Sequence, residues 1–299
     1  MVHHCPAVSD AARALPGAEI DWVVEEAFAG VARLHPNVRR VIPVAVRRWR
    51  RRILFHPALW KEVGDFRKAL RSEEYDAVID SQGLLKSALV ARVARGTRHG
   101  MDRASAREPL AARLYQQVHA VPRGLHAVER NRRLSAAALG ISLPSNVDYG
   151  LRVKPQFAQT EAMPAAYSVL LTMTSRADKL WPERRWIELG RALAIPLVLP
   201  WGNVEERARA ERIALAVPRA FVPRKMGIEA LGQVLAQARS VVGLDSGLTH
   251  LAAALGAQTV ALFCGSDPVL TGVYGAARAV NLGAPGRPPE VLDVLRSLQ

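Results

Sequence analysis

The stretch Val241-Val242-Gly243-Leu244-Asp245-Ser246-Gly247-Leu248-Thr249-His250 places a short apolar run directly before a small polar turn. The run predicts a buried β-strand, and residues 248–255 predict a helix that ends at Gly256. A strand, a tight turn and a helix in this order form half of a βαβ unit, from which parallel sheets with helices on both faces are built. The stretch therefore predicts an α/β fold.

The same alternation of strands and helices continues on both sides of this stretch. Further strands are predicted at 20–24, 38–46, 77–79, 168–171, 197–199 and 259–263. Helices are predicted over 57–72, after Gly83, over 108–118, 126–139 and 204–214, and from Pro182 and Pro289. Two halves of this kind predict two Rossmann-like parallel-sheet domains facing a cleft at the carboxyl ends of their strands.

A polar, proline-containing stretch at 142–156 is the predicted domain boundary. We therefore expect an N-terminal domain over 1–153 and a C-terminal domain over 154–284. A C-terminal helical segment over 285–299 follows, for which packing back on the N-terminal domain is one option.

The composition favours an anionic partner. Among 299 residues, 41 Lys and Arg exceed 27 Asp and Glu, which gives a net charge of +14. Such a surplus suits nucleic acid, an acidic membrane face, or phosphorylated and carboxylated substrates. Two cysteines, Cys5 and Cys264, exclude a disulfide framework, and the scattered histidines predict no metal site. No apolar run approaches the roughly 20 residues of a spanning helix, and residues 1–6 lack the apolar core of a signal peptide, so a cytoplasmic chain is expected.

The turn at 245–250 is a candidate anion site. Free backbone N–H groups at a helix start, together with the helix dipole, attract phosphate. Gly247 allows a ligand to approach closely, and His250 lies near enough in sequence to reach it. The alternative is an ordinary helix cap, because Asp245 and Ser246 are favoured capping residues.

A second turn, at 172–182, also follows a strand and precedes a helix. Thr174 and Ser175 offer hydroxyl groups, and Lys179 offers a point charge suited to phosphate, although a solvated loop is the alternative. Two such turns at one sheet edge favour a nucleotide diphosphate. Neither matches a Walker A loop or a Gly-x-Gly-x-x-Gly fingerprint, so an NTPase and an NAD enzyme are disfavoured.

A third strand end, at Pro200-Trp201-Gly202, is followed by Glu205 and Glu206. A carboxylate at this place could accept hydrogen bonds from ribose hydroxyls. The alternative is that the pair only supplies acidic residues to the first turn of a helix.

Two basic clusters lie in the first half. The run Arg47-Arg48-Trp49-Arg50-Arg51-Arg52 is consistent with one wall of the cleft, with a solvated charge run, or with nucleic-acid binding. Lys86, Arg107 and Arg130 form the second cluster, in which Arg130 could be structural. No nucleic-acid-binding module accompanies either cluster, so no nucleic acid is expected as a partner.

Several motifs, taken in order, carry a resemblance to a known family. They are Asp21-Trp22-Val23-Val24-Glu25-Glu26, Val41-Ile42-Pro43-Val44, Arg47-Arg48-Trp49-Arg50, Tyr75-Asp76-Ala77-Val78-Ile79-Asp80, Gln82-Gly83-Leu84, His99-Gly100-Met101-Asp102, Ala106-Arg107-Glu108-Pro109-Leu110-Ala111, Asp178-Lys179, Trp181-Pro182-Glu183, Leu199-Pro200-Trp201-Gly202, Asp245-Ser246-Gly247-Leu248-Thr249-His250-Leu251 and Gly272-Val273-Tyr274-Gly275. The chain resembles the bacterial lipopolysaccharide heptosyltransferases of glycosyltransferase family 9, which have the GT-B fold. The Arg-Arg-Trp-Arg and Ala-Arg-Glu-Pro segments indicate the type I branch.

The resemblance implies transfer of L-glycero-D-manno-heptose from ADP-heptose, the donor substrate, to the first Kdo of Kdo2-lipid A, without a cofactor. It implies a monomer that is peripheral on the anionic cytoplasmic face of the inner membrane. The implied donor-binding residues are Thr174, Ser175, Lys179, Glu205 (or Glu206) at the ribose, Met226 at the adenine, Asp245, Ser246, Gly247 and His250. The implied acceptor-binding residues are Arg47, Arg48, Arg50, Lys86, Arg107 and Arg130. Lys179 is also expected to act in catalysis.

The resemblance also implies one departure. Family members begin with a strand and a glycine-rich turn that carries an aspartate, the general base, whereas this sequence starts at Met1 just after that point. We therefore expect the first strand and the base to be absent, the N-terminal domain to be unstable, and donor binding to be better preserved than transfer. Two other functions stay open: a type II enzyme acting on a heptosylated core, and a non-catalytic nucleotide-sugar binder.

Overall fold

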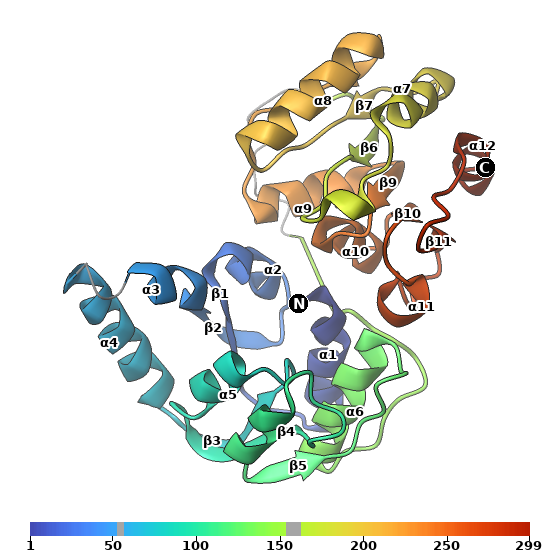
Figure 1. The fold of residues 1–299 in the computed structure, drawn as a ribbon. Helices are drawn as coiled ribbons and strands as arrows, with labels where there is room; N and C mark the ends of the chain where they lie inside the picture. The colour runs from blue at the N-terminus through green and yellow to red at the C-terminus, as the bar shows by residue number, and fades with distance from the viewer. Residues whose placement is uncertain (53–56, 154–162) are drawn as a thin grey trace. The chain divides into compact units, whose positions relative to one another are not determined.

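The computed structural model describes residues 1–52, 57–153 and 163–299 (Figure 1). The chain divides into two compact units between Gly150 and Leu151, close to the predicted boundary at 153/154. Each unit has its own sheets and its own core, and each is described separately below.

The C-terminal unit is a doubly wound parallel sheet, as its alternating sequence predicts. Six parallel strands lie in the order β11-β10-β9-β6-β7-β8. The strands are β6 (Ser168–Leu171), β7 (Leu197–Val198), β8 (Ala220–Phe221), β9 (Ser240–Leu244), β10 (Thr259–Phe263) and β11 (Ala279–Gly283). The helices are η5 (Ala177–Lys179), α7 (Glu183–Ala192), α8 (Val204–Ala216), α9 (Ile228–Gln237), α10 (Gly247–Ala254), α11 (Pro268–Thr271) and α12 (Val291–Ser297).

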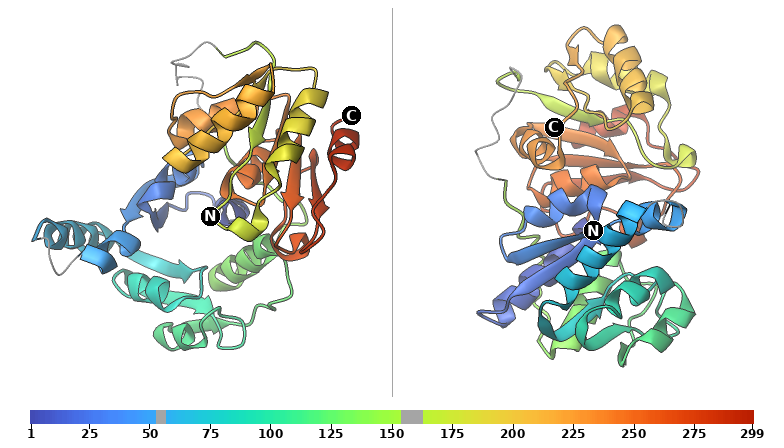
Figure 2. Two further views of the ribbon diagram at one scale, coloured as in Figure 1. Left: turned by 45° about the horizontal axis from the view of Figure 1, so that its top comes forward. Right: turned by 90° about the vertical axis from the view of Figure 1, so that its left-hand side faces the viewer.

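Helices cover both faces of this sheet because its central strands are apolar on both sides (Figure 2). Alternate side chains of a strand point to opposite faces. Leu244 and Leu262 therefore pack in one core with residues of α7, α8 and α12, whereas Phe263 packs in a second core with Ala253 of α10. Val294 of α12 is fully buried in the first core, so residues 285–299 belong to the C-terminal unit.

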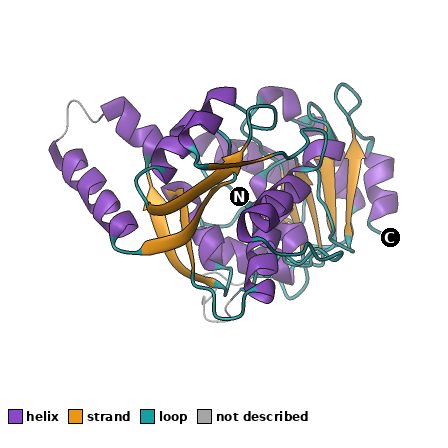
Figure 3. Ribbon diagram, turned by 90° about the horizontal axis from the view of Figure 1, so that it is seen from below, coloured by secondary structure: helices purple, strands orange, loops and turns teal. Residues whose placement is uncertain are grey.

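The N-terminal unit has two small parallel sheets in place of the single sheet implied by a Rossmann-like half (Figure 3). One sheet pairs β1 (Ile20–Glu25) with β2 (Val38–Val44), and the other has the order β3 (Glu74–Asp80), β4 (Arg95–Met101), β5 (Gln117–His119). Among the described residues, β1 pairs with β2 alone and β3 pairs with β4 alone. The helices are η1 (Val2–His4), α1 (Cys5–Ala14), η2 (Glu26–Phe28), α2 (Ala29–Arg33), α3 (Val46–Arg52), α4 (Pro57–Arg71), α5 (Leu85–Ala91), η4 (Pro109–Leu114) and α6 (Ala127–Leu139).

One prediction for this unit is wrong, and a second is confirmed with a different end. The helix predicted over 108–118 is instead the short 3-10 helix η4 followed by strand β5. The strand predicted over 38–46 ends at Val44, and the arginine run that follows is the helix α3.

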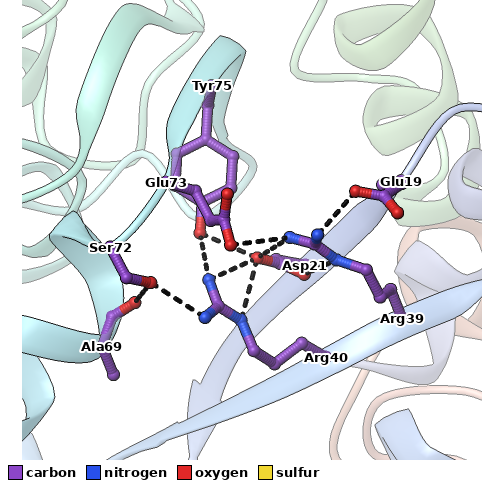
Figure 4. Close-up of polar contacts among 8 residues, drawn as sticks. All are labelled: Glu19, Asp21, Arg39, Arg40, Ala69, Ser72, Glu73 and Tyr75. Atoms are coloured by element: carbon purple, nitrogen blue, oxygen red, sulfur yellow. Dashed lines mark hydrogen bonds and ion pairs between the residues drawn. The ribbon is translucent and has the colours of Figure 1, made fainter.

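A charged network ties the amino ends of the two sheets together (Figure 4). Arg39 Nε and Arg40 Nη2, from β2, donate to the Asp21 carboxylate of β1 at 3.0 Å and 2.7 Å, and the Tyr75 hydroxyl of β3 donates to it at 2.8 Å. Burial would raise the pKa of Asp21, but the bonds from Arg39, Tyr75 and Arg40 outweigh it and hold that pKa below its usual value. Because ligands of α/β sheets bind at the carboxyl ends of the strands, we assign this network to stability.

Along the ranges that the structure describes, no helix is long and apolar enough to cross a membrane.

Candidate functional site

A polar cluster lies at the carboxyl edge of the C-terminal sheet. Its members come from the loops after β6, β9 and β10, which are neighbours in the sheet. Lys179 Nζ lies 2.6 Å from Asp245 Oδ2, and the Ser266 hydroxyl donates to the same oxygen at 2.5 Å. His250 Nε2 lies 3.3 Å from the other oxygen, Oδ1. The structure thus joins the two turns that the sequence indicated separately, and it adds Ser266.

The cluster keeps Asp245 charged. Burial acts to raise the pKa of this carboxyl group, but hydrogen bonds from His250, Lys179 and Ser266 outweigh it and hold the pKa well below its usual value. The Lys179 side chain is 18% exposed and that of Asp245 is 8% exposed. An ammonium group is therefore held at the edge of the sheet, partly open to solvent and fixed by one carboxylate.

The backbone at the start of α10 is shaped by small residues. A Cβ at Gly243 would lie 2.3 Å from Thr249 Oγ1, which donates to the Leu244 carbonyl at 2.6 Å. The Thr174 hydroxyl donates to the Asp245 carbonyl at 3.1 Å, which ties the β6 loop to this turn.

The capping alternative for this turn does not fit the structure. Ser246 occupies the N-cap position, but its side chain makes no capping hydrogen bond, and the Asp245 carboxylate binds the cluster. In the ranges that the structure describes, no side chain caps the backbone N–H groups at the start of α10, and an anion site requires such N–H groups.

The loop after β6 lies against the loop after β10. A Cβ at Gly265 would lie 2.6 Å from the Asp178 carbonyl oxygen, so the glycine permits this close approach and places Ser266 beside Lys179. Ser175 is exposed, and Thr174 is half-buried.

The loops after β7 and β8 extend the same edge. Asn203 caps α8 by accepting from the Glu206 amide at 2.9 Å, and the Glu206 carboxylate accepts in return from the Gly202 amide at 2.7 Å and from Asn203 Nδ2 at 3.1 Å. Glu205 is exposed. Trp201 Nε1 donates to the Pro223 carbonyl at 2.7 Å and so links this loop to the one that carries the half-buried Met226.

The basic residues of the N-terminal unit divide into two groups. On α3, Arg48 is paired with Glu26 at 2.8 Å and with Glu62 at 2.6 Å, and these partners raise its pKa. Arg47 is exposed, and its backbone amide donates to Glu25 at 3.3 Å. The side chain of Arg50 lies outside the described residues.

The second group surrounds the carboxyl edge of the sheet β3-β4-β5. Arg130 Nη2 donates to the Ser105 carbonyl at 2.7 Å, and Arg130 Nε is buried without a partner in the part of the chain that the structure describes. Burial, then Arg123, then Arg107 lower the pKa of Arg130, so these three guanidinium groups act on one another. Lys86 and Arg107 are exposed.

Arg123 was missed by the sequence analysis. It donates to the Ala106 carbonyl, in the same loop that carries Arg107. It follows β5, a strand that the sequence does not predict, so no signal in the sequence marks it.

The described ranges contain no group of three or more His, Cys, Asp and Glu side chains able to hold a metal ion.

Comparison with known proteins places this geometry in a family. Residues 63–291 match the sequence profile of "Glycosyltransferase family 9 (heptosyltransferase)". Lipopolysaccharide heptosyltransferase 1 of Escherichia coli K12 is 45% identical over 285 residues, which cover 94% of this chain and 89% of that protein. The protein of the same name from Pseudomonas aeruginosa PAO1 is 45% identical over 291 residues, which cover 95% of this chain and 80% of that protein.

Solved structures agree with the sequence relatives. The E. coli heptosyltransferase WaaC with ADP has a TM-score of 0.90 at 43% identity, and the match covers 99% of this chain and 94% of the WaaC chain. The same enzyme with ADP-2-deoxy-2-fluoro heptose has a TM-score of 0.86 at 41% identity over the same shares of each chain. The predicted GT-B type of fold, with parallel α/β sheets, is thereby confirmed.

Proposed function

Because the chain belongs to glycosyltransferase family 9, the heptosyltransferases, we propose that it moves L-glycero-D-manno-heptose from ADP-heptose to the first Kdo of Kdo2-lipid A. The reaction builds the inner core of lipopolysaccharide. The relatives of highest reported identity carry the name lipopolysaccharide heptosyltransferase 1, and one of the solved structures holds an ADP-heptose analogue.

The order of the loops in the C-terminal unit is the observation that carries the donor assignment. Adjacent strands β9, β6, β7 and β8 present in turn Asp245, Lys179, Glu205 beside Glu206, and Met226. Three strand spacings of about 4.8 Å give a row about 14 Å long. An extended ADP-sugar offers its groups in the matching order: diphosphate, ribose and adenine.

The chemistry of each position supports this order. A diphosphate suits the ammonium group of Lys179 and the uncapped N–H groups at the start of α10. A ribose suits a carboxylate: Glu205 is exposed and accepts no hydrogen bond from the described residues, whereas the Glu206 carboxylate already accepts from Gly202 and Asn203. Met226 offers an apolar, polarisable surface to a flat base. Thr174, Ser175, Ser246, Gly247 and His250 complete the proposed donor site.

The proposed mechanism is an in-line displacement. The Kdo hydroxyl oxygen attacks the anomeric carbon of heptose and releases its proton to water, while the bond from that carbon to the phosphate oxygen breaks and ADP leaves with the electron pair. Lys179 and the N–H groups of the turn stabilise the charge that grows on the departing diphosphate. We assign none of the described residues to the general base.

The acceptor assignment rests on charge. Kdo2-lipid A carries phosphates and carboxylates, which suit the cluster of Arg107, Arg130 and Lys86. Arg47, Arg48 and Arg50 are proposed as further contacts, although Arg48 would have to release or share its two glutamate partners.

ADP binding tests the donor half of the proposal. In calorimetric titrations, Lys179→Ala should weaken ADP binding by about tenfold to a hundredfold, the equivalent of one charge-assisted hydrogen bond. Lys68→Ala, which removes an exposed lysine of α4, is the matched control and should bind as the unchanged chain does. Equal ADP affinity in both variants would reject the donor site.

Turnover tests the reaction. With ADP-heptose present, heptose should pass to Kdo2-lipid A, and Arg107→Gln should raise the KM for that acceptor without changing ADP affinity. Transfer only to an acceptor that already carries heptose would support a type II enzyme. ADP-heptose binding without transfer to either acceptor would support a non-catalytic nucleotide-sugar binder.

A further inference from the structure

Exposed leucines concentrate on α5 and η4 of the N-terminal unit. Leu89 is 56% exposed, Leu110 52% and Leu85 38%. Leu85 and Leu89 are four residues apart on α5 and therefore lie on the same face of that helix. Large apolar side chains left in water at such short spacing mark an interaction surface.

α5 and η4 pack against each other. The Leu85 amide donates to Glu108 Oε2 at 2.6 Å, and the Glu108 amide donates to the Gly83 carbonyl at 2.9 Å. Ala88 of α5 and Ala111 of η4 are buried in the same small core. We call this surface the α5–η4 face; it comprises Leu85, Leu89 and Leu110 with their exposed basic neighbours.

The α5–η4 face is strongly basic. The segment 81–119, which contains β4 and β5 as well as the two elements of the face, has seven Lys and Arg and two Asp and Glu, a net charge of +5. Both acids are engaged: Asp102 accepts the Ser105 amide at 2.8 Å, and Glu108 accepts the Leu85 amide. The exposed basic residues of the two elements and their flanks are Lys86, Arg92, Arg107 and Arg113.

We propose that the α5–η4 face docks on the surface of an anionic lipid bilayer. Apolar side chains ringed by lysine and arginine are what a peripheral protein presents to such a surface: the leucines enter the headgroup boundary, and the cations attract the anionic headgroups. A second copy of the chain is the weaker candidate, because self-association through this face would bring two strongly positive surfaces together.

This inference rests on the proposed function and adds to it the surface through which the chain would meet a membrane. Lys86 and Arg107, proposed to bind the acceptor, lie on or beside the same two elements as the leucines. The acceptor is a lipid whose sugars and phosphates stand at headgroup level. Docking through the α5–η4 face would therefore bring the acceptor-binding cations to the depth at which the acceptor is found.

Vesicle co-sedimentation of the full chain tests the inference. The probes are vesicles of phosphatidylethanolamine with phosphatidylglycerol, and vesicles of phosphatidylcholine alone. The test variant is Leu85→Gln with Leu89→Gln and Leu110→Gln. The control is Val204→Gln with Leu215→Gln, which removes two apolar side chains that are even more exposed, from α8 in the other unit. Thermal unfolding of both variants confirms that they fold, since exposed sites contribute little to stability.

The triple variant should bind the phosphatidylglycerol vesicles at least about tenfold more weakly than the unchanged chain, while the control keeps full binding. Added salt should weaken binding, and phosphatidylcholine vesicles should retain little protein. Unchanged vesicle binding by the triple variant would overturn the inference. So would equal binding to both kinds of vesicle, or self-association of the unchanged chain that the triple variant abolishes.

The proposed function can be rejected while the docking inference stands. ADP affinity does not involve these leucines, so the triple variant should bind ADP normally. If the unchanged chain binds anionic vesicles through this face but does not bind ADP, the docking inference stands and the proposed function is rejected.

Discussion

Replacing Asp245 by Asn would expose how much the cluster at the sheet edge depends on a single charge. The amide has the shape of the carboxylate, so packing is preserved, but Lys179 loses the counter-charge that lies 2.6 Å from its ammonium group. Breaking a buried ion pair by removing one partner costs about 3–5 kcal/mol. Because Lys179 is 18% exposed and can regain water, we expect a loss of about 2–3 kcal/mol in the free energy of unfolding.

The assay is thermal and urea unfolding of the full chain. For a unit of about 150 residues, each kcal/mol corresponds to roughly 2–4 °C, so the Tm of the C-terminal unit should fall by about 5–10 °C. The double variant Asp245→Asn with Lys179→Met removes both charges and should recover most of that loss.

The pH dependence has a defined sign. The pKa of Asp245 is lower in the folded protein than the 3.8 of a free aspartate. The contribution of Asp245 to the free energy of unfolding is therefore complete above pH 3.8 and is lost as the pH falls below that value. The difference between the unchanged chain and Asp245→Asn should therefore shrink in acid. An Asn variant as stable as the unchanged chain at neutral pH, or a gap that persists in acid, would refute this account of the cluster.

Three further variants test other parts of the structure. Asp10→Ala leaves the buried Arg132 without the carboxylate that lies 2.7 Å from its Nε, and urea unfolding should show a loss of about 3–5 kcal/mol; a loss below 1 kcal/mol would contradict this pairing. Gly243→Ala places a methyl group against Thr249 Oγ1, so we expect about 1–3 kcal/mol of destabilisation and weaker ADP binding, measured by unfolding and calorimetry. Burial lowers the pKa of His4 from 6.5 to about 4, so stability should fall by about 3 kcal/mol as the pH drops from 6.5 to 4; His4→Asn should flatten that part of the stability curve.

The C-terminal unit was largely predictable because its strands carry their own signal. The runs 168–171 and 259–263 are buried at every position, and the observed strands have the predicted bounds. A continuous apolar run between two turns identifies such a strand without any knowledge of its neighbours.

The N-terminal strands could not be predicted in the same way. The sequence of β4, Arg-Gly-Thr-Arg-His-Gly-Met, contains two glycines, which are poor strand formers, and lacks a continuous apolar run. It is held by pairing with β3 on one side and β5 on the other, contacts distant in sequence. The same lack of local signal explains why the sequence predicts a helix over 108–118. In the structure, Gln117–His119 instead forms the strand β5, which is held by pairing with β4.

The residues of the candidate site also divide into those that the local sequence predicts and those that only the structure brings in. Lys179 and Asp245 each follow a recognisable strand, so both turns were predicted, although the ion pair that joins them depends on the strand order β9-β6. Ser266 also follows a predicted strand, 259–263, but the pairing of that strand with β9, which brings Ser266 to Asp245, comes from the structure alone. Arg123 follows a strand with no local signal, so only the structure brings it near Arg107 and Arg130.

The positions of the arginines decide where the net charge can act. Arg48 and Arg132 contribute to the formal surplus, but each is already paired with two carboxylates. Arg130 is in the opposite state: its neighbours Arg123 and Arg107 are also cations, and together with burial they lower its pKa. A group whose charged form is disfavoured in this way is stabilised by an incoming anion, because the anion offsets the repulsion among all three guanidinium groups at once. The same total charge therefore serves two purposes, fold stability where carboxylates are close and anion binding where they are not, and the cluster around Arg130 is where a phosphate or carboxylate of the proposed acceptor would gain most.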